Sequence, residues 1–179
     1  SKAQWQKGQS SMPGGVIKGA YWSSPYPDYV DRAEGCYVWN LDGQKFVDFG
    51  NHHSAMLLGH SHPNVIKAIE KELKRGLGLG GPTTLEAEIS EEIVNRFPSV
   101  DQVRFANSGT EASLHATRMV KTITGRPKIA KFEGAYHGSH DALEVSVATP
   151  LDKAGDSASP NSIGGQKGMS SSAEEDVII

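Results

Sequence analysis

Ser108, Gly109, Thr110 and Glu111 form the stretch of this sequence whose residue types and spacing are best suited to chemistry. A short apolar run precedes them and a helix-forming pattern follows, which predicts a strand, a tight turn and a helix start. The N–H groups at a helix N-terminus carry partial positive charge, and with two hydroxyls and a glycine they would hold a phosphate group. The spacing of Ser108 and Glu111 equally fits a capping box that only begins the helix.

A second candidate is the stretch Phe132–Gly138, which follows the next predicted strand. In a parallel α/β sheet it would begin at the same edge as Ser108. Tyr136 lies between two glycines and could rest flat against a planar ring ligand. It could equally be a tyrosine that covers the sheet edge.

Two histidines and an aspartate in the next few residues could bind a metal ion. However, the spacing of His137, His140 and Asp141 is weak, and no further cluster of Cys or His residues would complete a closed site. No metal ion is therefore expected. The glycine-rich segment 76–81 lacks the Lys-Ser/Thr pair of a P-loop and is predicted to be a flexible connection.

The elements that must position these residues follow from periodicity and turn signals. Helices are predicted over 63–75, 84–96 and 111–124, strands over 100–105, 129–132 and 177–179, and a hairpin over 37–49. The alternation of helices and strands after residue 85 predicts an α/β fold with a parallel sheet flanked by helices. Residues 1–35 are predicted to be an extended arm, and residues 150–173 a mobile surface loop.

These elements divide into two expected regions. Residues 1–75 would form an arm, a hairpin and a helix at an interface or in a small domain, and residues 76–179 the first part of a larger domain. The last residues read as a buried strand with no helix after it, which predicts that the fold is incomplete.

Composition limits the function classes. The chain has 179 residues, of which 37% are hydrophobic and 22% charged, as is typical of globular proteins. A net charge of −3 gives no basic surface for nucleic acid or an anionic membrane, and no apolar run approaches the ~20 residues of a membrane span. Cys36 is the one cysteine, and no secretory leader pattern opens the sequence, so a cytoplasmic location is predicted.

The stretches Asn107–Ala112 and Lys131–Gly138 resemble the class III aminotransferases. The similarity is greatest to the branch that contains glutamate-1-semialdehyde aminomutases and D-phenylglycine aminotransferases. It covers about residues 10 to 145. Supporting motifs occur in the same order, at Met12–Val16, Asn40–Gly43, Leu58–Pro63 and Gly81–Thr83.

The resemblance implies a homodimeric enzyme of fold type I with its active site at the interface and pyridoxal 5′-phosphate (PLP) as cofactor. Such an enzyme transfers an amino group between a small-molecule donor and acceptor through a Schiff base. An amino acid or a related amine is the expected substrate. Ser108, Gly109 and Thr110 would hold the phosphate, and Tyr136 would stack on the pyridine ring with His137 beside it.

This sequence departs from the family pattern at two places. The Schiff-base lysine and the acidic partner of the pyridine nitrogen lie further along in the family, so the catalytic residue is unknown here and these 179 residues alone are expected to be inactive. The aminomutases also carry an arginine for the substrate carboxylate near the position of Tyr21. A tyrosine cannot form that bidentate charged contact, which argues against glutamate-1-semialdehyde as substrate.

The stretch Asn51–Ala55 replaces one that carries a tryptophan in the aminomutases and is more similar to D-phenylglycine-type aminotransferases. In those enzymes a histidine at this place meets the substrate carboxylate. His53 is therefore the candidate substrate contact, together with Tyr21; a histidine that packs under the arm is the alternative.

Three functions stay open at this point. A PLP-dependent aminotransferase or aminomutase accounts for most motifs. A non-catalytic module that binds a phosphorylated ligand without the Schiff-base lysine would share the same phosphate site. A metal-dependent hydrolase built on His137, His140 and Asp141 would leave Ser108–Glu111 unexplained.

Overall fold

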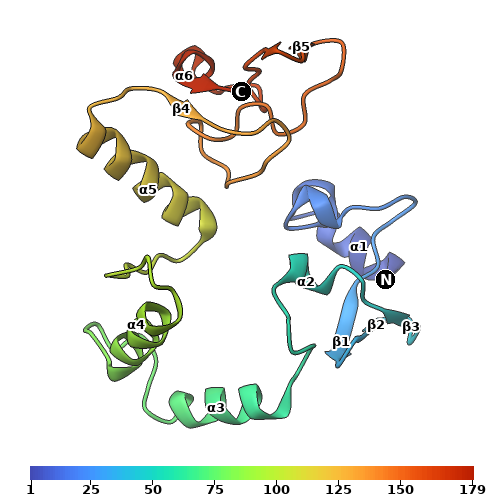
Figure 1. Cartoon of the computed structure of the whole chain (residues 1–179). Coiled ribbons are helices and arrows are strands. Elements are labelled where there is room, and N and C mark those ends of the chain that lie inside the picture. Colours follow the sequence, from blue (N-terminus) through green and yellow to red (C-terminus); the bar gives the residue numbers. More distant parts are fainter. The chain divides into compact units, whose positions relative to one another are not determined.

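The computed structural model describes all 179 residues, which form two compact units, Ser1–Pro82 and Thr83–Ile179 (Figure 1). The expected boundary after residue 75 lies at the start of the glycine-rich segment that closes the first unit. The assignment of the two regions to a small domain and a cofactor-binding domain stays a prediction. None of the helices combines the length and the apolar character needed to cross a bilayer.

The first unit is built around a small antiparallel sheet. Its elements are α1 (Lys2–Gln9), the 3-10 turns η1 (Pro13–Gly15) and η2 (Gly19–Tyr21), β1 (Val30–Glu34), β2 (Tyr37–Asn40), β3 (Lys45–Val47), α2 (Asn51–Ser54) and α3 (Pro63–Leu73).

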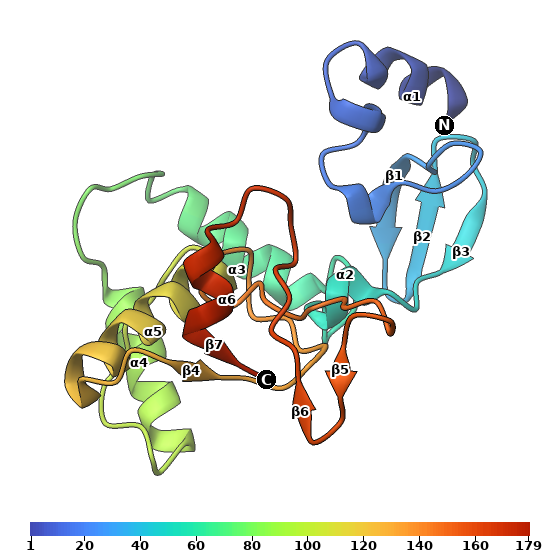
Figure 2. The same ribbon diagram turned by 90° about the horizontal axis from the view of Figure 1, so that it is seen from above.

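The predicted hairpin is confirmed, and a third strand joins it (Figure 2). Strands β2 and β3 pair antiparallel, and Asn40 organises the turn between them by accepting the N–H groups of Asp42 and Gln44 at 3.0 and 2.9 Å. Strand β1 pairs with β2 along the other edge, so the last residues of the expected arm belong to the sheet. Strand β1 has no apolar alternation, so it is difficult to recognise from sequence; it forms because a neighbouring strand is there to pair with it.

The expectation of an extended arm is also wrong for the first residues, which fold back on themselves. The indole of Trp5 donates to the carbonyl of Gly14 at 3.0 Å and stacks on Tyr26, with ring centroids 6.0 Å apart. The hydroxyl of Tyr29 donates to the carbonyl of Gly15. Burial of these rings within the arm avoids the cost of leaving them in water.

The second unit contains two long helices, one short helix and two pairs of short strands. Its elements are α4 (Thr84–Arg96), α5 (Gly109–Thr124), β4 (Ile129–Ala130), β5 (Gly155–Asp156), β6 (Ser159–Pro160), α6 (Ser171–Asp176) and β7 (Val177–Ile178).

The predicted helices agree closely with the observed ones. A capping box of Thr83 and Glu86 begins α4 at the expected residue. Helix α5 begins two residues before the expected start and ends at Gly125, which adopts the left-handed conformation with φ of 65°. The helix predicted over 63–75 is α3, which ends at Leu73.

The sheet of the second unit is parallel, as predicted, but small. Strand β4 pairs with β7, with Ile129 opposite Val177. Beside this pair, Val145, Ala173 and Val177 form the buried core. The strand predicted over 100–105 is absent, since no strand of the unit lies beside these residues to pair with them.

Residues 150–173 are not the featureless mobile loop that their composition predicts. Strands β5 and β6 form a short hairpin within the segment, and the side chain of Asn161 donates to the carbonyl of Lys153 at 3.0 Å. Glu174 of α6 accepts the N–H of Gly164 at 2.6 Å. These polar contacts order the segment, although it lacks the apolar periodicity from which helices and strands are normally predicted.

Candidate active site

The N-terminus of α5 offers free hydrogen-bond donors. Ser108 is its N-cap residue, and its hydroxyl oxygen accepts the N–H of Glu111 at 3.2 Å, while the Glu111 carboxylate accepts the N–H of Asn107 at 2.8 Å. The capping interpretation is therefore realised. It does not exclude anion binding, because the Ser108 hydroxyl can donate while it accepts, and the N–H groups of Gly109 and Thr110 have no partner within the helix.

The loop that carries Tyr136 and His137 packs against this first turn. The Thr110 hydroxyl accepts the N–H of Ser139 at 3.1 Å. A side chain at Gly138 would place its Cβ 2.6 Å from the Cα of Thr110, so only glycine permits this approach. The carbonyl of His137 accepts a hydrogen bond from Ser113 at 2.6 Å. The structure thus brings the two predicted stretches together.

A shallow hollow lies between helix and loop. It is lined by Gly109, Thr110, Ala112, Ser113, Ala116, Tyr136, His137 and Gly138. Four of the five predicted cofactor-binding residues lie in this lining, and Ser108 caps the helix directly before it. Tyr136 is 60% exposed, so its ring is free to receive a ligand, and its hydroxyl contacts that of Ser139 at 3.0 Å.

Ser113, which lines the hollow, and His140 support the Tyr136 loop. The sequence indicated His140 only as a possible metal ligand and did not single out Ser113. The Ser113 oxygen lies 3.1 Å from Nε2 of His140. Because Ser113 has one proton and donates it to a carbonyl, Nε2 of His140 carries the hydrogen of this bond. Nδ1 is buried without a partner. Burial lowers the pKa of His140 and Arg118 lowers it further, while Asp141 and Glu144 oppose this shift.

The metal interpretation finds no support in the geometry. His140 is engaged with Ser113, and the Asp141 carboxylate accepts the N–H of Ser170 at 3.2 Å. No group of three or more His, Cys, Asp or Glu side chains is placed to hold a metal ion.

Lys131 is buried, although it belongs to a motif that the sequence singled out. Its ammonium donates to the carbonyl of Val145. Burial lowers the pKa of this amine, and Glu133 opposes the shift. The contact fixes β4 to the segment around Val145, and this role accounts for the lysine without a part in catalysis.

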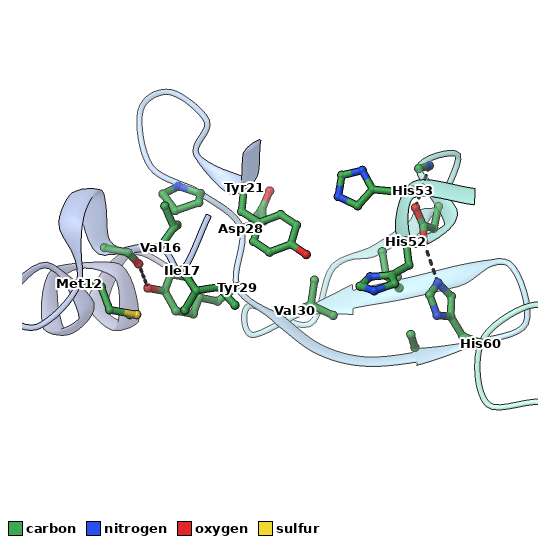
Figure 3. A pocket seen from close by; sticks show the side chains of 16 residues that line it. Met12, Val16, Ile17, Tyr21, Asp28, Tyr29, Val30, His52, His53 and His60 are labelled. Carbon is green, nitrogen blue, oxygen red and sulfur yellow. Dashed lines mark hydrogen bonds and ion pairs between the residues drawn. The ribbon is translucent and has the colours of Figure 1, made fainter. Parts of the chain in front are cut away.

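A second pocket lies within the first unit and contains both candidate substrate residues (Figure 3). The rings of Tyr21 and His53 stack at a centroid distance of 6.3 Å and an interplanar angle of 28°. The pocket is lined by Met12, Gly15, Val16, Ile17, Tyr21, Pro27, Asp28, Tyr29, Val30, Ala33, Val38, Asp48, Gly50, His52, His53 and His60. Imidazoles are the only basic groups in this lining. His53 is exposed, and the residue on which its ring stacks belongs to the expected arm, so a substrate contact and packing against the arm both stay open.

The two histidines sit on a left-handed turn. Asn51, His52, His53 and Ser54 have φ values of 44°, 48°, 56° and 68°. A left-handed conformation costs a residue with a side chain about 1–2 kcal/mol, so surrounding contacts must hold this turn in place.

Asp48 supplies such contacts. One carboxylate oxygen accepts the N–H groups of Gly50 and Asn51, each at 2.9 Å, and the other lies 2.7 Å from Nε2 of His60. The hydrogen bond to His60 is the largest cause that lowers the pKa of Asp48, followed by that to Asn51. The sequence contained no signal for this pair, because the two residues lie 12 positions apart.

Comparison with known proteins identifies the family of this chain. The model of the family "Aminotransferase class-III" matches residues 19–177. The chain belongs to the class III aminotransferase family. Class III aminotransferases use PLP, and two of the solved structures that this chain resembles are described as a transaminase with PLP bound and an aminomutase in complex with PMP.

Individual relatives agree with this assignment. The glutamate-1-semialdehyde 2,1-aminomutase of Methanothrix thermoacetophila is 37% identical over 179 residues, a match that covers 100% of this chain and 40% of that protein. An omega-transaminase from Sphaerobacter thermophilus superposes with a TM-score of 0.93 at 35% identity and covers 99% of this chain and 40% of its own. A structure described as a transaminase with PLP bound superposes with a TM-score of 0.88 at 34% identity, and the match covers 99% of this chain and 40% of that chain.

These matches confirm the expected fold, that of PLP-dependent transferases of fold type I. The chain spans 40% of the length of these relatives. The hollow at α5 fits a phosphorylated, planar cofactor: it offers two free main-chain N–H groups, two hydroxyls and an exposed aromatic ring.

Proposed function

We propose that this chain is the cofactor-binding and substrate-recognising part of a PLP-dependent aminotransferase or aminomutase-like enzyme. The observation that carries the proposal is the packing of the Tyr136 loop on the first turn of α5, which joins phosphate donors and a stacking ring in one hollow. A phosphate site alone would occur in many proteins; the aromatic loop held against it by Gly138 and Ser113 selects a phosphate attached to a planar ring.

Each residue of the hollow has a defined task in this proposal. The N–H groups of Gly109 and Thr110, with the hydroxyls of Ser108 and Thr110, would bind the phosphate, and the positive end of the α5 dipole would favour its charge. Tyr136 would cover one face of the pyridine ring, with His137 beside it. When bound, PLP withdraws electrons from the substrate carbon that carries the amino group.

In the first unit, we propose that His53 and Tyr21 contact the substrate. The imidazole of His53 can donate a hydrogen bond to a carboxylate, and the apolar lining from Met12, Val16 and Ile17 favours a substrate with an apolar or aromatic group. No arginine lines the pocket, whereas recognition of glutamate-1-semialdehyde in the aminomutases uses one, and this difference disfavours that substrate. The one cation recorded near Tyr21 is Lys18, 6.0 Å from the ring centroid, and a lysine does not offer the same bidentate contact.

We also propose that the protein works as a homodimer. Several large apolar side chains of the first unit stay exposed, among them Ile17 at 77% and Phe49 at 93%. Exposed apolar surface of this kind is normally covered by other protein, either a partner subunit or the part of the family fold that this chain does not span. The homodimer is the state that the resemblance to class III aminotransferases implies. The cytoplasmic location expected from the lone cysteine stays a prediction.

The test of the cofactor site uses the complete protein titrated with PLP, with the absorbance of the bound cofactor as the readout. Thr110→Val, which removes a proposed phosphate donor, is expected to weaken PLP binding about tenfold. Thr122→Val is the matched control, because the Thr122 hydroxyl only donates to Arg118 of its own helix and is exposed. A protein that binds no PLP would refute the proposal; one that binds PLP but whose absorbance no amine changes would be a non-catalytic module.

The test of the substrate contact compares two amines of the same skeleton. Phenylglycine carries a carboxylate where 1-phenylethylamine carries a methyl group. His53→Phe is expected to raise the half-saturating concentration of phenylglycine about fivefold or more and to leave that of 1-phenylethylamine within about twofold. Equal changes for both amines would show that His53 does not recognise the carboxylate.

A further inference from the structure

The turn that carries His52 and His53 is held by residues outside it. Its four left-handed residues are not glycines, so the conformation is unfavourable on its own. Within the turn, the bonds are long: Ser54 N–H to Gly50 at 3.2 Å and Met56 N–H to Asn51 at 3.4 Å. The stronger contacts come from Asp48, which binds the main chain at the first residues of the turn.

Asp48 is itself fixed to the sheet from two directions. Its N–H donates to the carbonyl of Cys36 at 2.9 Å, next to strand β2. Its carboxylate contacts His60, and the two side chains are only 19% and 16% exposed. His60 is in turn anchored through its main chain, which exchanges hydrogen bonds of 2.9 and 2.8 Å with Gly35.

Gly59 makes this anchoring possible. It has φ of 79°, and a Cβ there would lie 2.8 Å from the Gly35 carbonyl oxygen. The contacts from Gly35 to His60 to Asp48 to Asn51 are therefore continuous, and they end at the residue directly before His52. Figure 3 shows His52, His53 and His60 in the lining of the pocket.

We propose that Asp48 and His60 are positioning residues: their contact holds the left-handed turn Asn51–Ser54 and thereby sets where His52 and His53 meet the substrate. The claim that the contact holds the turn stands by itself. The claim that it sets where the two histidines meet the substrate rests on the proposed function of the pocket. Neither residue needs to touch the substrate for this role. The depressed pKa of Asp48 agrees with a carboxylate that stays charged while it serves three donors.

The first experiment reports on the turn and is independent of activity. Amide hydrogen exchange is measured in the complete protein and in His60→Ala, His60→Gln and Asp48→Asn. In His60→Ala, the amides of Gly50 and Asn51 are expected to exchange about tenfold faster. His60→Gln keeps a side-chain donor and should restore slow exchange. Asp48→Asn replaces the charged acceptor of both amides by a weaker neutral one, so the same amides are expected to exchange faster; this variant covers the case that His60→Ala fails to fold. Unchanged exchange in His60→Ala and Asp48→Asn would overturn the proposal.

The second experiment links the turn to recognition. With PLP bound, His60→Ala is expected to raise the half-saturating concentration of phenylglycine about fivefold while the maximal rate changes less than about twofold. The double variant with His53→Phe should be no worse than His53→Phe alone, because both changes remove the same contact. Arg75→Ala, which breaks an exposed ion pair of the same unit, is the control.

The outcomes separate the two levels of the proposal. Full additivity of His60→Ala and His53→Phe would show that the pair acts elsewhere and would overturn the positioning role. If the unaltered protein binds PLP but responds to neither amine, the proposed function fails, and amide exchange alone decides whether Asp48 and His60 hold the turn.

Discussion

The hollow at α5 and the histidine pocket are both proposed to bind a small molecule, but their contact groups are held in position in different ways. In the hollow, the proposed phosphate contacts come from three consecutive residues, Ser108 to Thr110, and the start of the helix itself orients them. In the pocket, the proposed ligands are side chains on a strained turn, and residues from the sheet must hold it. A site made of backbone is specified locally, whereas a site made of side chains depends on every contact that supports them.

The supporting groups also differ in electrostatics. Behind the hollow, His140 is kept neutral because burial disfavours its charged form. Beneath the pocket, Asp48 is kept charged because His60 and two main-chain N–H groups bind it. Acid disturbs both supports, but at different pH.

The largest effect is expected at the closest contact in the hollow. Gly138→Val combines a positive φ of 104° with a Cβ only 2.6 Å from the Cα of Thr110. The loop must move away from α5, so PLP affinity is expected to fall at least about tenfold, or ~1.4 kcal/mol. Equilibrium titration with PLP measures it. Gly81→Ala is the control, since a Cβ there meets nothing within 4 Å. Equal affinities would mean that the loop does not form the site.

The corresponding change beneath the pocket is Gly59→Ala. The added Cβ would meet the Gly35 carbonyl oxygen at 2.8 Å, and φ is 79°. We expect about 1–3 kcal/mol of lost stability and weaker phenylglycine recognition, with PLP affinity retained. Urea-induced unfolding and PLP titration of the same variant measure both. A parallel loss of PLP affinity would break the distinction between the two sites.

A smaller effect is expected from Ser113→Ala. The variant removes the donor to the His137 carbonyl and the acceptor of His140. Loss of one such bond costs about 1 kcal/mol, so PLP affinity should decrease several-fold with the loop still in place. Ser90→Ala in α4 serves as control, because the Ser90 hydroxyl donates only to Glu86 of its own helix. An unchanged affinity would show that Ser113 does not position the loop.

The smallest effect is a difference in pH dependence. The pKa of His140 is lowered from 6.5 in the folded protein, so the unfolded chain binds more protons as the pH falls. The contribution of His140 to the free energy of unfolding is therefore complete above pH 6.5 and is lost as the pH falls towards the folded-state pKa. The pKa of Asp48 is lowered from 3.8, so its contribution persists above 3.8 and is lost only below that value. His140→Gln should therefore flatten the stability curve as the pH falls below 6.5, and Asp48→Asn only as it falls below 3.8.

Urea-induced unfolding across this range measures the free energy of unfolding for each variant. Curves that flatten in the same pH window for both variants would contradict the separate supports inferred for the two regions.

The elements that the sequence predicted well are those with local causes. Helix α4 begins at a capping box of neighbouring residues, and α5 is bounded by Ser108 and Gly125. The β2–β3 hairpin follows from its turn residues. The elements that were predicted wrongly depend instead on a neighbouring strand. Strand β1 forms because β2 lies beside it, and no strand forms over 100–105 because no other strand lies beside these residues. Pairing between distant segments leaves little trace in a window of sequence.

By itself, the sequence indicated the family through its ordered motifs, and it indicated a phosphate site at Ser108–Thr110, because a helix N-terminus carries its donors wherever the helix begins. It also indicated Tyr21 and His53 as candidates. Only the tertiary structure decided that Gly138 touches Thr110, that Ser113 and His140 support the loop, and that Asp48 and His60 hold the left-handed turn. Those contacts join residues 12 to 29 positions apart, and distances between such residues are fixed by packing rather than by local conformational preference.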